Sequence, residues 1–198
     1  DAIQNAIETT VKTFGGLDIL VNNASAISPT GLLDTSPQRY DLLQSINTRG
    51  TYLCSHFAVP YLRRSRNPHV LTLSPPISTR AKWYGTYAAY AISKYGMTMC
   101  TLGVAEEFRT DGIAANSLWP RTMIATDAVR VHYEDEYRRS RYPAIMADAA
   151  YLIVTKSSRT FSGNSLIDED FLRDEGLSDF SHYAIDPRVE LAADILID

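Results

Sequence analysis

Two patterns of hydrophobic residues alternate along the chain. Short and almost wholly apolar runs at 17–21, 70–74, 112–119 and 164–168 predict strands, and such runs are typical of parallel sheets that helices cover on both faces. Between them, apolar residues recur at helical spacing over 3–14, 36–62, 85–108 and the segment that follows Pro143. Strands that alternate with helices predict an α/β fold built on a parallel sheet.

Capping residues and breaks in the pattern locate some of the helix ends. Gly15-Gly16 ends the first helix, and Ser36 followed by Pro37 is typical of a helix start. Asn47 falls inside a helical pattern, where it marks either a kink whose freed backbone groups bind water or simply a polar neighbour. Residues 122–141 are amphipathic and charged, and they predict a further helix.

The last part of the chain differs in composition from the rest. Beyond the strand predicted at 164–168 it is acidic and irregular, and its apolar residues predict that it packs on the preceding part; these are Phe171, Leu172, Phe180 and Tyr183. The sequence therefore predicts one α/β unit at 1–167 and an acidic extension at 168–198.

A tyrosine and a lysine share one face of the helix predicted at 85–108. Tyr90 and Lys94 are four residues apart, so the phenol projects beside the ammonium. A nearby positive charge favours the phenolate and lowers the pKa of a tyrosine toward the range useful for general acid-base catalysis. The alternative is a tyrosine on the rim of a buried helix with a lysine that extends past it to water.

Polar residues and a proline follow three of the predicted strands. Asn22-Asn23, Ser74 and Pro120 all lie at carboxyl ends, which in a parallel sheet form the edge where ligands bind. Each can also be read as a simple turn. Their convergence on one edge is the physical argument for a site.

Composition narrows the function classes. The 198 residues are 45% hydrophobic and 21% charged with a net charge of -4, which predicts one globular domain and argues against a nucleic-acid partner. No apolar run is long enough for a membrane span, the opening residues do not form a signal peptide, and Cys and His show no metal-ligand spacing. The two cysteines, Cys54 and Cys100, suit a reducing, intracellular compartment.

Four motifs together resemble the short-chain dehydrogenase/reductase family. They are Asn22-Asn23-Ala24-Ser25, Asn47-Thr48-Arg49-Gly50, Tyr90-Ala91-Ile92-Ser93-Lys94 and Asn116-Ser117-Leu118-Trp119-Pro120, in the family's order and approximate spacing. The resemblance implies a Rossmann-like three-layer fold and an oxidoreductase that uses NAD or NADP to interconvert an alcohol and a carbonyl, on an apolar or lipid-like substrate.

The resemblance also implies roles for individual residues. Tyr90 would exchange a proton with the substrate oxygen, and Lys94 would lower the pKa of Tyr90 and hold the nicotinamide ribose. Asn47 would hold a water that links Lys94 to solvent. The resemblance also implies that four residues line the cofactor cleft: Asn23, Ala24, Pro120 and Thr126. It further implies a homo-oligomer formed through the helices near 47–62 and 87–108, in the mitochondrion or peroxisome, although the chain does not end in Ser-Lys-Leu.

The sequence departs from the family pattern at three places. At the expected position of the catalytic serine, alignment by strand end places Pro75, so Ser74 is the substitute candidate, with Ser78 nearby. The glycine expected after Pro120 is Arg121, which either reaches a phosphate or points into solvent. The Gly-rich phosphate loop has no match at all, and the chain opens where the first three strands of the family have already passed.

These departures predict the carboxyl-terminal part of a longer enzyme. Expressed alone, these residues should be inactive, poorly soluble through the unpaired edge of the strand at 17–21, and unable to bind nucleotide. The alternative from another class is a non-catalytic dimerisation or partner module derived from the same fold.

Overall fold

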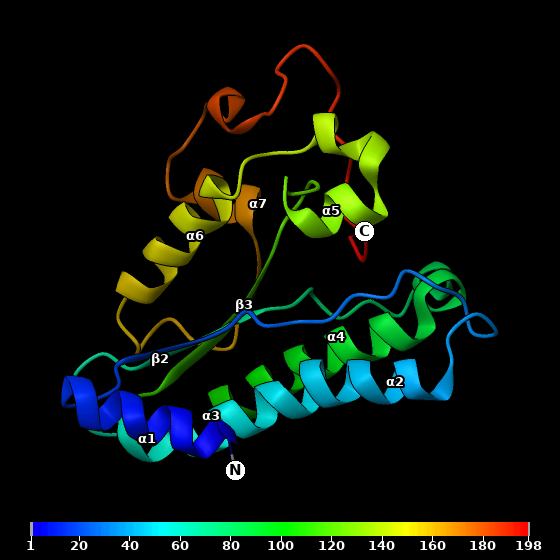
Figure 1. The fold of residues 1–198 in the computed structure, drawn as a ribbon. Helices are drawn as coiled ribbons and strands as arrows, with labels where there is room; N and C mark the ends of the chain where they lie inside the picture. Colours follow the sequence, from blue (N-terminus) through cyan, green and yellow to red (C-terminus); the bar gives the residue numbers. More distant parts are fainter. Residues whose placement is uncertain (1, 198) are drawn as a thin grey trace.

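The computed structural model describes residues 2–197, which form a four-stranded parallel sheet between two layers of helices (Figure 1). The strands β1 (Ile19–Asn22), β2 (His69–Leu73), β3 (Ala114–Trp119) and β4 (Ser165–Ile167) lie side by side in chain order. The pairing of Val70 with Ala115 and of Leu118 with Leu166 illustrates the register. The predicted Rossmann-like α/β fold is therefore confirmed.

One face of the sheet is covered by the helices that precede and follow β1 and β2. These are α1 (Ala2–Phe14), α3 (Gly50–Leu62) and α4 (Ala81–Glu107), and they enclose a core that includes Leu62, Val70 and Ile113. The opposite face carries α6 (Ala144–Thr155) and α7 (Asp168–Asp174), which pack against Leu71 and Leu118. Because Val70 and Leu71 point to opposite faces, β2 is buried from both sides.

A π-helical turn interrupts the helical run that begins at Ser36. The hydroxyl of Ser36 accepts a hydrogen bond from Arg39 N and caps α2 (Pro37–Leu43), as the sequence predicts. The π-helix η1 (Gln44–Arg49) follows and leads directly into α3. Asn47 lies inside this turn and is fully buried, so it marks an irregular turn and not simply a polar surface position.

Two segments differ from their predicted secondary structure. The single helix predicted at 122–141 is instead α5 (Asp127–His132) followed by the 3-10 helix η2 (Glu134–Arg139). The segment predicted to be irregular after Asp168 begins with α7 and contains a short 3-10 turn, η3 (Ser181–Tyr183). Three acidic residues in the first turn of α7 favour the helix through its dipole, although its sequence carries no helical apolar pattern longer than Phe171-Leu172.

The chain returns near its end to the carboxyl edge of the sheet. Within the described part of the extension, Ala192, Ile195 and Leu196 are buried. The backbone holds this segment against the residues that follow β3, because Met123 N donates to Ala192 O at 3.0 Å and Asp194 N donates to Arg121 O at 3.1 Å. Residues 192–197 therefore cover the edge where the predicted ligand site lies.

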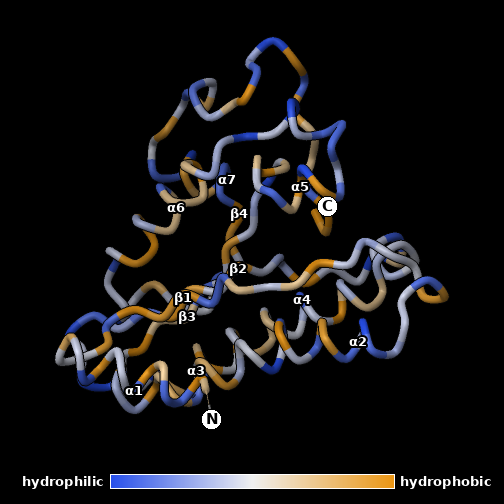
Figure 2. The backbone as a smooth tube through the Cα atoms, viewed as in Figure 1, coloured by the Kyte–Doolittle hydropathy of each residue, from blue (hydrophilic) through white to orange (hydrophobic). Residues whose placement is uncertain are grey.

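The outer edge of β1 is the most exposed part of the sheet. Ile19 is 41% exposed and Val21 is 50% exposed, although both are large and apolar. Figure 2 shows the backbone coloured by hydropathy, with hydrophobic segments around the label of β1. An apolar strand edge of this kind is available for pairing with another strand. Over residues 2–197, none of the helices combines the length and the apolar character that a bilayer crossing requires.

Candidate active site

Tyr90 lines a cavity at the carboxyl edge of the sheet. It lies on α4, which starts at Ala81, earlier than predicted, and has an irregular turn at Tyr87. The cavity has a volume of about 130 Å³ and is lined also by Trp119, Pro120, Thr126, Tyr133 and Asp194. Its remaining walls are mainly apolar and include Ile27, Met123, Ile124, Val129 and Ile195. The site is therefore a small apolar chamber with a few polar groups.

Lys94 lies behind the wall of this cavity. Its side chain is buried, and its ammonium donates to the carbonyl oxygen of Leu73 at the end of β2 at 2.8 Å. The same ammonium lies 4.9 Å from the centroid of the Trp119 ring. Burial lowers the pKa of Lys94 to about 7, and the nearby Asp194 partly opposes that shift.

The pKa of Tyr90 moves in the opposite direction from the prediction. Burial raises it well above its ordinary value, and the charge of Asp194 and the neighbouring Tyr133 raise it further. The expectation of a lowered pKa for Tyr90 is thus wrong for this structure, because burial of the phenol sets the direction of the shift. Tyr90 is a neutral phenol at physiological pH.

Asn47 uses its side-chain amide to join three parts of the chain. Its Oδ1 accepts from Ala26 N at 2.8 Å, and its Nδ2 donates to Ala26 O and to Ser93 Oγ, both at 2.9 Å. Ala26 belongs to the loop after β1, and Ser93 directly precedes Lys94. The amide thus fixes the loop and the helix relative to each other.

Ser74 does not share the cavity of Tyr90. It is fully buried, and its Oγ lies 2.8 Å from Oγ1 of Thr98 on α4. The Thr98 hydroxyl also lies 2.7 Å from Pro75 O. The hydroxyl of Ser74 is thus engaged with Thr98, and Ser74 is not one of the residues that line the cavity beside Tyr90. Ser78 accepts from Arg80 N and lies outside the cavity as well.

The predicted cofactor residues divide into two groups. Pro120 and Thr126 line the cavity, where Thr126 also caps α5 by accepting from Val129 N. Asn23 and Ala24 are exposed in the loop after β1 and do not line it. Their neighbour Asn22 is buried and points toward Ser55 and Thr72.

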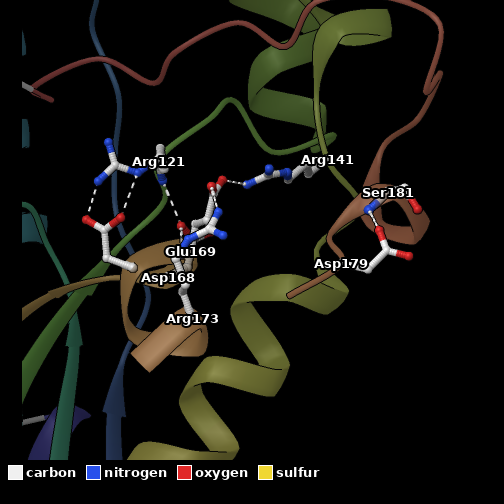
Figure 3. Close-up of polar contacts among 8 residues, drawn as sticks. Arg121, Arg141, Asp168, Glu169, Arg173, Asp179 and Ser181 are labelled. Atoms are coloured by element: carbon white, nitrogen blue, oxygen red, sulfur yellow. Dashed lines mark hydrogen bonds and ion pairs between the residues drawn. The ribbon is translucent and has the colours of Figure 1, made fainter. Parts of the chain in front are cut away.

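Arg121 is held by an acidic partner on α7 (Figure 3). Its Nε donates to Asp170 Oδ1 at 3.1 Å, and its backbone N donates to Asp168 Oδ1 at 2.8 Å. In this structure the guanidinium is therefore paired with a carboxylate and does not simply point into open solvent. It connects the loop after β3 to the start of α7.

Three aromatic or charged residues of the cavity, Trp119, Tyr133 and Asp194, were not among the predicted site residues. Trp119 directly precedes Pro120, so its place at a strand end could have suggested it. Tyr133 and Asp194 come from segments far along the chain with no motif of their own, and only the fold brings them to Tyr90. Among residues 2–197, no group of three or more His, Cys, Asp and Glu side chains is arranged to hold a metal ion.

Comparisons with known proteins place this geometry among dehydrogenases. A family model described as Enoyl-(Acyl carrier protein) reductase matches residues 1–151. Hydroxysteroid dehydrogenase-like protein 2 from Xenopus laevis is 49% identical over 197 residues, which is 99% of this chain and 47% of that protein. The chain thus spans about half the length of the curated relatives it matches.

Solved structures agree with this result. A crystal structure of a protein from Xanthomonas campestris is 45% identical, with a TM-score of 0.95 over 99% of this chain and 72% of that chain. A short-chain dehydrogenase from Mycobacterium thermoresistibile is 46% identical, with a TM-score of 0.93 over 100% of this chain and 71% of that chain.

Proposed function

Because the chain belongs to the short-chain dehydrogenase/reductase family, we propose that it carries the proton-transfer site of an NAD(P)-dependent enzyme that reduces an apolar carbonyl to an alcohol. The observation that carries this proposal is the cavity in which a buried Tyr90, with Lys94 behind it, meets an apolar wall. Burial keeps the phenol of Tyr90 protonated, which is the form that the reduction of a carbonyl requires at its start.

The residues present fit the nicotinamide end of the cofactor. The ammonium of Lys94 donates hydrogen bonds to Leu73 O and to the sulfur of Met97. Its third N–H would then be available to a ribose hydroxyl. Pro120 and Thr126 line the cavity beside Tyr90 and would face the nicotinamide ring. No Gly-rich phosphate-binding motif occurs in the sequence. These residues therefore account for the binding of the nicotinamide end only, and not of the pyrophosphate.

The reaction balances with one proton from this site. When bound, the reduced nicotinamide would supply the hydride that reduces the carbonyl carbon of the substrate. The carbonyl π bond would break as the oxygen takes the phenolic proton of Tyr90, so the substrate would gain one hydride and one proton and leave as the alcohol. Lys94, whose pKa is about 7, is balanced between its two protonation states near neutral pH and returns a proton to the tyrosinate.

The chemistry of the cavity wall supports an apolar substrate. Aliphatic and thioether side chains and the rings of Trp119 and Tyr133 line the cavity together with Tyr90. Such a wall binds hydrocarbon next to the reacting oxygen and excludes water from it. An apolar ketone or alcohol, including a lipid-derived one, matches this lining.

A second role is suggested by exposed apolar side chains on α3 and α4. Tyr52 is 59% exposed, Ile92 45% and Met99 58%, and residues of this kind are typical of surfaces that bind another protein. We propose that this face joins two copies of the chain. Sedimentation analysis of a Met99→Glu variant tests it, and an unchanged molecular mass would contradict it.

The test of the catalytic proposal is Tyr90→Phe in the protein at its native length. Oxidation of NADPH and NADH is followed with a panel of apolar ketones, and kcat should fall by about 10²-fold or more because the proton donor is lost. Tyr151→Phe is the matched control, since Tyr151 is 67% exposed on α6. Equal turnover by Tyr90→Phe and the wild type would overturn the proposal.

A further inference from the structure

Asp194 reaches the cavity from the end of the chain and is held there from both sides. Its backbone N donates to Arg121 O at 3.1 Å, and the next residue accepts from the Trp119 indole, with Nε1 2.9 Å from Ile195 O. The two anchors are Trp119, the last residue of β3, and Arg121 in the segment that follows, and Trp119 itself lines the cavity. These hydrogen bonds therefore fix the position of Asp194 in the wall of the site.

The surroundings of the Asp194 carboxyl favour its protonated form. Burial raises its pKa well above the ordinary value, and the negative charge of Asp168 adds to that shift. The ammonium of Lys94, the backbone N–H of Ile195 and the indole of Trp119 act in the opposite direction and do not cancel it. The other titratable groups nearby are Tyr90 and Tyr133, both of which stay neutral because their own pKa values are raised.

A substrate oxygen in this cavity needs a second hydrogen-bond donor. Tyr90 supplies one, but negative charge that develops on a carbonyl oxygen is stabilised best by two aligned donors. The hydroxyl of Ser74 is engaged with Thr98 on α4, and that of Thr126 accepts the cap hydrogen bond of α5. Asp194 lines the same cavity as Tyr90.

We propose that Asp194, as a neutral carboxylic acid, donates the second hydrogen bond to the substrate oxygen beside Tyr90. This inference rests on the proposed reductase function. A tyrosine paired with a protonated carboxyl group is a known arrangement for stabilising an oxyanion in an apolar site. Because Asp194 lines the same cavity as Tyr90, its protonated carboxyl group would present a hydroxyl to a substrate oxygen bound there.

The test compares Asp194→Leu with Asp194→Asn in the protein at its native length. Leucine has a similar shape and no donor, so kcat should fall by about 10²-fold, as for the loss of an oxyanion-hole donor. Asparagine keeps an N–H donor and should retain most of the turnover. In the wild type, activity should fall as pH rises through the pKa of the Asp194 acid, and in Asp194→Asn that alkaline limb should move to higher pH.

A second readout does not depend on turnover. The infrared band of a protonated carboxyl group should be present in the wild type at neutral pH and absent from Asp194→Asn. Asp179→Asn, in an exposed turn, is the control and should leave the band and the pH profile unchanged.

The outcomes separate this inference from the proposed function. Full turnover by Asp194→Leu, or equal losses in both variants with an unmoved alkaline limb, would overturn the role of Asp194 even if Tyr90→Phe is inactive. An active Tyr90→Phe would overturn the reductase function itself. Absence of the infrared band from the wild type would show an ionised carboxylate and overturn the inference.

Discussion

The side-chain amide of Asn47 donates a hydrogen bond from Nδ2 to Oγ of Ser93 at 2.9 Å, and Ser93 directly precedes Lys94 on α4. The same amide holds both backbone groups of Ala26 in the loop after β1. The π-turn η1 makes this possible, because it directs Asn47 into the interior and away from solvent. One buried side chain thus sets the position of the loop and of the helix that carries Tyr90 and Lys94.

Replacing Asn47 with alanine should destabilise the fold by about 1–3 kcal/mol. The reason is that the partly buried N–H of Ala26 would lose its acceptor and the hydroxyl of Ser93 would lose its hydrogen bond from the amide. Urea unfolding followed by circular dichroism measures the loss, with Asn5→Ala, exposed on α1, as the control. A variant as stable as the wild type would mean that water replaces the amide at no cost.

A second prediction concerns the contact between α4 and η1 at Gly96. A Cβ at this position would lie 2.6 Å from Oγ1 and 2.8 Å from Cγ2 of Thr48, and the short, branched threonine has little freedom to move. Gly96→Ala should therefore destabilise the protein by about 1–3 kcal/mol, as overpacking does.

Gly103 on the same helix is the matched control for Gly96. A Cβ there would meet nothing within 4 Å, so Gly103→Ala should raise the free energy of unfolding by up to about 1 kcal/mol through helix propensity alone. Thermal unfolding of Gly96→Ala, Gly103→Ala and the wild type under the same conditions measures the two changes in stability. The explanation fails if both substitutions change stability in the same direction.

The parts of this structure that the sequence predicted are those set by local pattern. The four strands and most helices follow from apolar runs, and the helix start at Ser36-Pro37 follows from capping chemistry. Pro120 and Thr126 share the cavity of Tyr90, as the motifs implied. In each case, residues close in sequence carry the information.

The parts that were missed depend on contacts between distant segments. Asp194 reaches Tyr90 only because the chain returns over the sheet edge, and nothing in its neighbours indicates that path. The direction of the Ser74 hydroxyl depends on Thr98, which is 24 residues away. The raised pKa of Tyr90 follows from burial, which a spacing of four residues does not report.

Two arginines that bind the same carboxylate should differ in their effect on stability (Figure 3). Arg141 and Arg173 both pair with Glu169, but the side chain of Arg141 is 6% exposed and that of Arg173 is 55% exposed. Breaking a buried pair leaves an uncompensated charge, so Arg141→Met should cost about 3 kcal/mol. Arg173→Met should cost less than about 1 kcal/mol. Chemical denaturation of both variants measures the difference, and similar losses would contradict the role of burial.

The last prediction concerns the stability of the fold as a function of pH, and it follows from the buried ammonium of Lys94. Its pKa is about 7 in the folded chain, whereas an unfolded lysine titrates near 10.4. Between these values the unfolded chain binds more protons at this position than the folded chain does, so the contribution of Lys94 to stability rises with pH.

Lys94→Met removes the cost of burying the charge. The gain in the free energy of unfolding of this variant over the wild type should therefore be largest at pH 7 and shrink toward pH 9.5. Urea unfolding of both proteins at the two pH values measures this change, with Lys12→Met, exposed on α1, as the control for the loss of one positive charge. A difference between Lys94→Met and the wild type that stays constant from pH 7 to pH 9.5 would show that Lys94 keeps its ordinary pKa, and the proton return to Tyr90 at neutral pH would then lose its physical basis.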